Sequence, residues 1–240
     1  MKENRFRAIW ANFVIVTMLV TTFGIAFAVA LPADGVTQTI NNAIYEGDGE
    51  CEKIALMFNV YENAANVEKI AKIIGERGHN CTFFVGGSWA AKNPNTLLKV
   101  ASNGFEIGNH GYLHRDHAKL TLKQNTEEIV LTERLIDGIL DDLPNYENSK
   151  LFAPPSGSIG DIMFDACREL GYKVIMWTRD TIDWRDHDAD LIYERAIRDV
   201  KAGDLILMHP TDWTVAALPR ILDYIESIGL SADTVGNVIE

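Results

Sequence analysis

Residues 54–85 read IALMFNVYENAANVEKIAKIIGERGHNCTFFV, and this stretch decides the fold class. Its two ends, residues 54–58 and 81–85, are short apolar runs that predict buried strands. Between them, residues 66–77 carry apolar side chains at helical spacing, and Gly78 follows as a residue that ends a helix. Strands that are apolar on both faces and joined through a helix indicate a parallel sheet.

The same alternation of strand and helix continues toward the C-terminus. About six or seven such units in roughly 190 residues predict an α/β fold, either a small barrel or a doubly wound sheet. Both architectures place the functional site at the C-terminal ends of the strands. The further predicted strands are 105–107, 151–152, 174–177 and 205–208, and the further predicted helices are 94–103, 121–140, 161–170, 188–202 and 215–228.

The N-terminus carries one apolar segment that is long enough to cross a membrane. Residues 9–31 contain no charged side chain, and Lys2, Arg5 and Arg7 precede them. Two interpretations stay open, an uncleaved signal anchor and a signal peptide cut near residues 28–30. We therefore expect a signal segment at 1–31, a linker at 32–50 and a domain at 51–240. The domain is expected outside the cell, held at the cell membrane by this helix or secreted.

The charge of the chain argues against nucleic acid as a partner. The 240 residues include 22 Lys and Arg against 34 Asp and Glu, a net charge of −12. Removing residues 1–30 takes away three positive charges and one negative charge, which leaves −14. A domain of this charge repels phosphate backbones, so we expect no nucleic-acid binding.

Polar residues follow several of the predicted strands. His110 and His114 lie four residues apart after a short strand and a Gly turn, a spacing that lets two neutral imidazoles reach one metal ion. His209 ends the apolar run 205–208, where a histidine can serve as a general acid. Asp180, Asp183 and Trp184 share one loop, which is a further candidate part of the functional site because it carries two carboxylates.

The three cysteines do not form a disulfide framework. Cys167 lies in an amphipathic helix and is expected to be buried. Cys51 and Cys81 both lie near the starts of consecutive strands, and export permits a disulfide between them. This bridge is an expectation that the structure can test.

Taken together, these residues resemble the NodB homology domain of polysaccharide deacetylases, carbohydrate esterase family 4, from about residue 53 to residue 240. The nearest likeness is to the cell-wall and sporulation subgroup. The matching motifs are His110-x-x-x-His114, residues 152–157 (FAPPSG), Asp180-x-x-Asp183-Trp184 and Leu207-x-His209. The resemblance implies a distorted (β/α)7 barrel that removes acetyl groups from N-acetyl sugars of peptidoglycan or chitin-like polysaccharides. It also implies a divalent metal, zinc first, held by His110 and His114.

The first motif departs from the family pattern. The family has Thr-Phe-Asp-Asp-Gly, whereas residues 57–61 read MFNVY, so Asn59 and Val60 replace the general base and the third metal ligand. Asn has no titratable carboxylate and Val cannot bind a metal. Ala153 replaces the family's Arg, which orients the base. Glu62, three residues after Asn59, is the carboxylate expected to stand in as ligand or base.

Two functions follow from the resemblance. One is a metal-dependent hydrolase of carbon–nitrogen bonds, in which His209 is the acid, Asp183 holds its imidazolium and Glu62 completes the catalytic set. The other is an inactive, membrane-anchored domain that binds glycans with the same cleft. In both, Trp184, Pro154 and Asn59 are expected to contact the sugar, with Trp184 beside the acetyl methyl group.

Overall fold

The computed structural model describes residues 43–144 and 146–240, which lie in the second of two compact units, 42–240. The predicted signal segment and most of the predicted linker lie outside the described residues. In the described part, no helix combines the length and the apolar character that crossing a membrane requires. Ile44, which lies within the predicted linker 32–50, forms a parallel bridge with Ile175.

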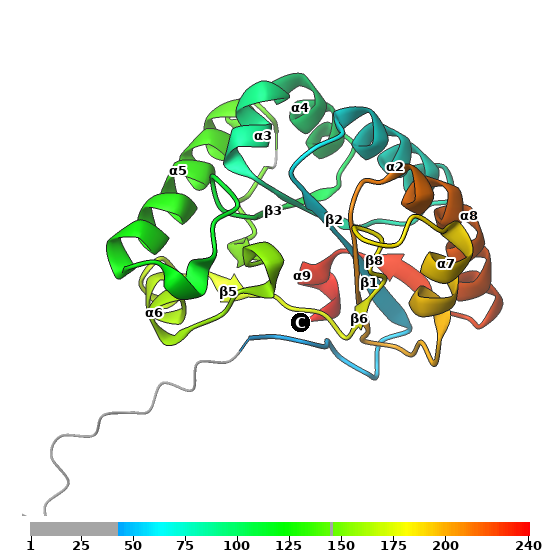
Figure 1. Cartoon of the computed structure of the whole chain (residues 1–240). Helices are drawn as coiled ribbons and strands as arrows, with labels where there is room; N and C mark the ends of the chain where they lie inside the picture. Colours follow the sequence, from blue (N-terminus) through cyan, green and yellow to red (C-terminus); the bar gives the residue numbers. More distant parts are fainter. Residues whose placement is uncertain (1–42, 145) are drawn as a thin grey trace, which may run out of the picture. The chain divides into compact units, whose positions relative to one another are not determined.

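A curled parallel sheet forms the centre of the fold (Figure 1). The central strand β1 (Lys53–Val60) pairs on one side with β2 (Thr82–Val85) and on the other with β7 (Leu205–Met208), and its first residues pair with β8 (Ser231–Asp233). The order along the sheet is β5-β4-β3-β2-β1-β7-β6. The remaining strands are β3 (Glu106–Asn109), β4 (Leu151–Phe152), β5 (Lys173–Val174) and β6 (Arg179–Asp180).

The stretch 173–180 links the two ends of the sheet. β5 pairs with β4 at one end of the strand order, whereas β6 pairs with β7 at the other end. Only four residues, 175–178, separate β5 from β6 along the chain. One continuous segment therefore touches both edges, which curls the sheet into a distorted barrel. The predicted fold class is confirmed, although only Val174 of the strand predicted at 174–177 lies in a strand, β5, and the unpredicted strand β6 follows at 179–180.

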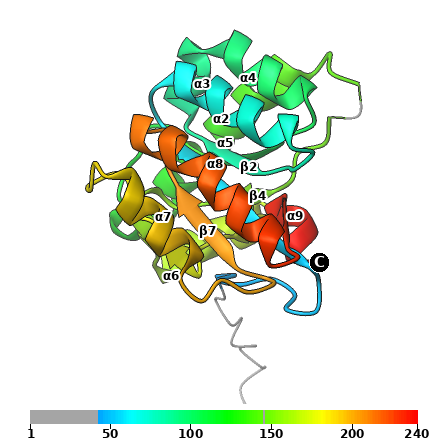
Figure 2. The same cartoon turned by 90° about the vertical axis from the view of Figure 1, so that its right-hand side faces the viewer.

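Most of the helices cover the outside of the curled sheet, as Figures 1 and 2 show, whereas the short C-terminal helix packs inside the curl. A capping box begins α5, because Thr121 Oγ1 accepts from the Gln124 N–H and the Gln124 side chain accepts from the Thr121 N–H. The helices are α2 (Ala64–Glu76), α3 (Gly87–Lys92), α4 (Pro94–Ser102), α5 (Leu122–Leu140), α6 (Asp161–Glu169), α7 (Ala189–Ile197), α8 (Asp212–Ser227) and α9 (Val235–Val238).

The alternation of side chains along β1 creates two cores. Ile54, Leu56, Phe58 and Val60 face the layer of helices, and all four are fully buried. Ala55 and Met57 point to the inside of the curl, where they pack with residues of α9. The apolar inner core therefore fills the end of the barrel where β1 begins, and the polar residue Asn59 lies further along the same face.

Three short elements and one helix end differ from the sequence prediction. Neither α3 nor the pair β8 and α9 is predicted, because four to six residues carry little periodicity. α7 ends at Ile197 rather than at 202. The physical reason is Arg179, whose guanidinium donates to the carbonyl oxygens of Arg198 and Asp199 and so competes with further helical hydrogen bonds.

The disulfide expected between Cys51 and Cys81 is wrong, because both thiols are free. The register pairs Met57 with Thr82, so Cys81 lies beside Leu56. Cys51 is five residues before Leu56, or about 16 Å along an extended chain. Bridged cysteines need Cα atoms within about 7 Å. The Cys51 thiol instead donates to the Asp48 carbonyl oxygen, 2.8 Å away.

We expect an alkylating reagent to modify only Cys51 in the native protein under non-reducing conditions. Burial raises the pKa of the Cys81 thiol well above its ordinary value and that of Cys167 to about 12, so both stay unreactive until the protein unfolds. Mass spectrometry before and after denaturation measures this. A denatured, unreduced protein that takes up only one label would show that a bridge is present.

Candidate functional site

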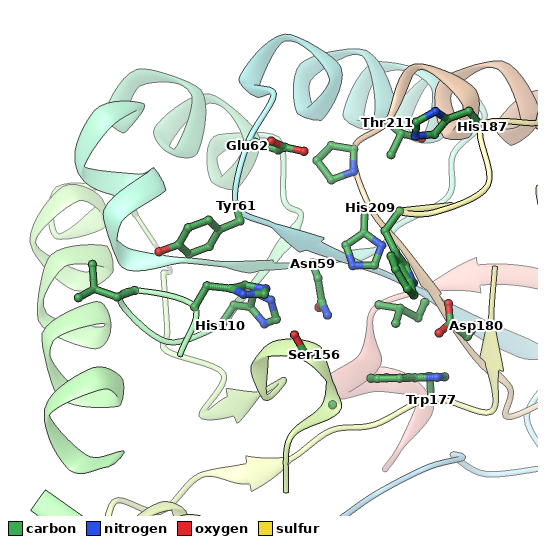
Figure 3. Close-up of a pocket in the computed structure, with 16 residues that line it drawn as sticks. Asn59, Tyr61, Glu62, His110, Ser156, Trp177, Asp180, His187, His209 and Thr211 are labelled. Atoms are coloured by element: carbon green, nitrogen blue, oxygen red, sulfur yellow. The ribbon is translucent and has the colours of Figure 1, made fainter. Parts of the chain in front are cut away.

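A pocket of about 790 Å³ opens at the C-terminal ends of β1, β3 and β7 (Figure 3). Parallel strands bring their C-terminal ends to one edge, so loops that are distant in sequence meet there. Its lining residues are Asn59, Tyr61, Glu62, His110, Leu113, His114, Ser156, Gly157, Trp177, Asp180, Trp184, His187, Leu207, His209, Pro210 and Thr211.

The end of β1 contributes one polar side chain to this pocket. Asn59 is 4% exposed and lies between His110 and His209 in Figure 3. Its Oδ1 atom is buried and has no hydrogen-bond partner. Val60, the next residue, is fully buried in the core beneath the helices, because successive side chains of a strand point to opposite faces.

The two histidines of the H-x-x-x-H motif come together. Their ring centroids lie 5.2 Å apart. His110 is buried, and its Nδ1 donates to the Ala153 carbonyl oxygen at 2.7 Å, which leaves Nε2 as the free nitrogen. Burial lowers the pKa of His110 to about 3, and desolvation also lowers the pKa of His114. Both rings are therefore neutral at pH 7.

A buried carboxylate holds the turn between these histidines. Glu128 of α5 accepts from the backbone N–H groups of Tyr112 and Leu113 at 2.8 and 2.7 Å. This turn places Gly111 and His114 at φ values of 71° and 54°, a region that favours glycine. Glu128 is not predicted from the sequence. It contacts backbone N–H groups 15 and 16 residues earlier in the chain, and no local pattern indicates such a contact.

The side chains present do not fit a three-ligand zinc site. His110 and His114 supply two nitrogens, but the described residues contain no group of three or more His, Cys, Asp or Glu that is placed to hold a metal. A catalytic zinc needs three protein ligands. Glu62 lines the pocket and is exposed, and in Figure 3 its carboxylate lies apart from His110 and Asn59. The structure does not bring Glu62 to the histidine pair as a third ligand.

The predicted acid and its partner do come together. His209 Nδ1 donates to Asp183 Oδ1 at 2.8 Å, and the His209 backbone N–H donates to Asp183 Oδ2 at 2.6 Å. Thr214 Oγ1 donates to the same Oδ2 at 2.5 Å. Asp183 is fully buried, so these donors stabilise its charge and fix the orientation of the imidazole. Thr214 also belongs to this hydrogen-bonded group around Asp183, and the sequence does not predict it.

Of the remaining residues predicted to contact a sugar, Trp184 lines the pocket and Pro154 does not. Trp184 lines the pocket and is 58% exposed. Pro154 is buried and does not line it, whereas Ser156 and Gly157 of the same loop do. Gly157 has a φ of 64°, and a Cβ there would meet the Trp177 ring at 2.8 Å. Pro154 thus lies behind the pocket wall, and the turn after it presents Ser156 and Gly157 to the pocket instead.

Ala153 contributes only its backbone to the site. Its carbonyl oxygen accepts from His110, and its N–H donates to the Asn109 carbonyl oxygen. Among the described residues, no Lys or Arg lines the pocket. A carboxylate at residue 59 would therefore be buried without a cationic partner, which is costly.

A model of the family described as polysaccharide deacetylase matches residues 46–175. The chain belongs to the polysaccharide deacetylase family. The matched residues include the first loop, the histidine pair and Ala153. Residues 183 and 209 lie beyond them.

Similar proteins come from bacilli. An uncharacterized protein, YlxY of Bacillus subtilis, is 34% identical over 197 residues, which are 82% of this chain and 60% of that protein. A peptidoglycan-N-acetylglucosamine deacetylase of Bacillus cereus is 28% identical over 78% of this chain and 87% of its own length. The chain thus spans less than two thirds of the length of YlxY.

The solved structures that resemble this fold include a pseudoenzyme. BA3943 of Bacillus anthracis, a pseudoenzyme of carbohydrate esterase family 4, has a TM-score of 0.78 at 27% identity, over 83% of this chain and 69% of that chain. A BA3943 mutant with restored enzymatic activity has the same TM-score at 26% identity, over 83% and 72%. The fold is thus shared with a pseudoenzyme and with a variant of it whose activity is restored.

We expect Asp183→Ala to lower the free energy of unfolding by roughly 3 to 5 kcal/mol, because it leaves buried donors without their acceptor. Thr214→Val removes one donor and is expected to cost about 1 kcal/mol. Asp223→Ala is the control, since its ion pair with Arg77 is at the surface and contributes little. Urea denaturation measures all three. Equal free energies of unfolding for Asp183→Ala and the control would contradict the hydrogen-bonded arrangement around Asp183.

Stoichiometric Zn²⁺ is expected to change the melting temperature of the full chain by no more than about 1 °C, because a weakly bound ligand adds little stability. Differential scanning fluorimetry with and without a chelator measures this. A rise of several degrees that His110→Ala abolishes would show a tight site, with a third ligand that the two histidines recruit.

Proposed function

We propose that this domain binds N-acetylated glycan strands of the cell wall, with peptidoglycan as the first candidate, in a deacetylase-like pocket that lacks the family's base and third metal ligand. The observation that carries the proposal is the end of β1. It places a buried, unpartnered amide, Asn59, in the pocket and a core side chain, Val60, outside it. The named activity of the Bacillus cereus relative supports peptidoglycan as the polymer.

The walls of the pocket suit a sugar. Leu207 and Trp177 offer apolar surface within it, and Trp184 and Leu113 are 58% and 56% exposed at its rim. His187, also at the rim, stacks on Trp213 with ring planes 9° apart. Exposed aromatic rings beside a few convergent polar groups are typical of a ligand site that takes flat, partly apolar molecules.

Deacetylation is the second candidate, and the buried Asp183–His209 pair favours it. Asp183 orients His209 Nδ1, so the other ring nitrogen is available to protonate a leaving amine, as a general acid does. A base is also needed, and Glu62 remains the candidate on the first loop. Its exposed position at the pocket mouth leaves it distant from Asn59, so this route has less support than binding.

The proposal includes export of the domain. The uncharged segment 9–31 with the basic residues before it supports a membrane anchor or a cleaved signal, and both would place the domain where cell-wall glycans lie. The excess of acidic residues fits neutral glycan better than anionic polymers.

The test is binding and acetate release measured on the same samples. We expect the full-length protein to bind N-acetylglucosamine oligomers and to release no acetate above the level of His209→Ala. If the protein is active, Glu62→Gln should lower turnover by on the order of a hundredfold, the usual size of a general-base effect. Acetate release that depends on Glu62 and His209 would establish the second candidate. Failure to bind any acetylated glycan would refute the proposal.

A further inference from the structure

The loop that carries Asp183 contains an isoleucine in a strained backbone conformation. Ile182 has a φ of 54°, and among the six non-glycine residues with positive φ in the described chain it is the only β-branched one. Left-handed backbone is unfavourable for such a residue, because its Cβ crowds the following carbonyl oxygen. Such a conformation persists only where surrounding contacts fix it. The contacts of this turn therefore decide where the next residue, Asp183, points.

Asp180 holds the turn from the side of the sheet. It is the last residue of β6, and the register pairs it with Leu207 of β7. Its Oδ1 accepts from the Ile182 N–H at 2.8 Å, the bond by which an Asp side chain fixes a turn two residues on. Thr181 donates to the Leu207 carbonyl oxygen through its N–H at 3.3 Å and its Oγ1 at 2.9 Å. The start of the turn is thus attached to the strand that precedes His209, and Figure 3 shows Asp180 and His209 on the side of the pocket away from His110.

Arg195 of α7 holds the turn from the side of the helices. Its Nη1 donates to the Thr181 carbonyl oxygen at 2.9 Å, and its Nη2 donates to Asp186 Oδ2 at 2.6 Å. The N–H groups of Arg185 and Asp186 donate to the Ile182 carbonyl oxygen at 3.2 and 3.0 Å. One planar guanidinium, whose donors have a fixed geometry, therefore joins the two ends of the turn.

We propose that Asp180 and Arg195 are positioning residues for the buried Asp183–His209 pair. They hold the left-handed turn at Ile182, and that turn directs the Asp183 carboxylate to the His209 ring. Because Asp183 holds Nδ1 at 2.8 Å, His209 presents its other ring nitrogen to the pocket that it lines. This inference rests on the proposed function, in which the pair is the acid of the deacetylation candidate, and adds what orients that acid.

Relaxation of the turn would separate the pair. An extended backbone at Ile182 relieves the crowding of its Cβ, but it rotates the next peptide and moves Asp183 away from the end of β7. The carboxylate would then lose its donors from His209 and Thr214, which lie at 2.5 to 2.8 Å. The contacts of the two positioning residues oppose this relaxation. Glycine adopts left-handed backbone without crowding, so a glycine at residue 182 would make the turn independent of them.

The experiment is nuclear magnetic resonance of the full-length protein labelled with 15N-histidine at pH 7, with His209→Ala to assign the signal of the His209 Nδ1 proton. We expect Asp180→Ala and Arg195→Met to speed exchange of this proton with water by at least about fivefold, the effect of losing one hydrogen bond. Asp180→Asn keeps the acceptor and should match the wild type. Asp188→Ala is the matched control and should also match it, because Asp188 Oδ1 accepts from the Asp190 N–H at 2.8 Å in the same way but caps α7.

A second comparison tests whether strain at Ile182 is the reason. In an Ile182→Gly background, Asp180→Ala is expected to change the exchange rate by less than about twofold, because the turn no longer needs support. The full fivefold effect in that background would overturn the role of the turn. Exchange in Asp180→Ala as slow as in Asp188→Ala, or in Asp180→Asn as fast as in Asp180→Ala, would overturn the role of Asp180.

Arg195→Met keeps the proposal testable if Asp180→Ala does not fold, which backbone amide spectra show. Unchanged exchange of the His209 proton in folded Arg195→Met would overturn the role of Arg195. No glycan enters these measurements. Failure to bind glycan would therefore refute the proposed function and leave the turn standing, whereas unchanged exchange would refute this inference and leave glycan binding standing.

Discussion

The parallel pairing of β1 with β2 and β7 is the constraint on which the site depends. The register pairs Asn59 with Phe84 of β2. On the other side of β1, it pairs Phe58, the residue before Asn59, with Met208 of β7. His209 comes directly after β7, so it reaches the level of Asn59. Because side chains alternate along a strand, a slip of one residue would exchange Asn59 with Val60, placing a polar amide under the helices. The apolar core on both faces of β1 prevents that slip.

Buried carboxylates hold the two histidine-bearing loops. Glu128 accepts from two backbone N–H groups of the turn between His110 and His114. Asp183 accepts from the backbone and the ring of His209 and from Thr214. Backbone and side-chain hydrogen-bond donors compensate each charge inside the protein, and Glu128 also forms an ion pair with Arg115 at 4.0 Å. The scaffold of the site is therefore complete, although the chemistry at its centre differs from the family pattern.

The departures from that pattern are consistent with one another. Where the family has an Arg beside an Asp, this chain has Ala153 and Asn59, so a cation and an anion are both gone. Loss of either one alone would leave a buried charge without its partner. What remains is a neutral, hydrogen-bonding floor of a pocket whose walls include Trp177 and Leu207.

The sequence by itself determined the class of fold and the residues that meet at the pocket. Periodicity located the long strands and helices, since burial forces those patterns, and the motif order placed His110, His114, Asp183 and His209 at strand ends. Tertiary structure alone decided the rest. It showed that Cys51 and Cys81 lie far apart, that Pro154 turns away and that Glu62 stays at the mouth. It also brought Glu128 and Thr214 to the site. The physical reason is that register, the direction of a loop and contacts between distant segments depend on packing of the whole sheet, which no local pattern encodes.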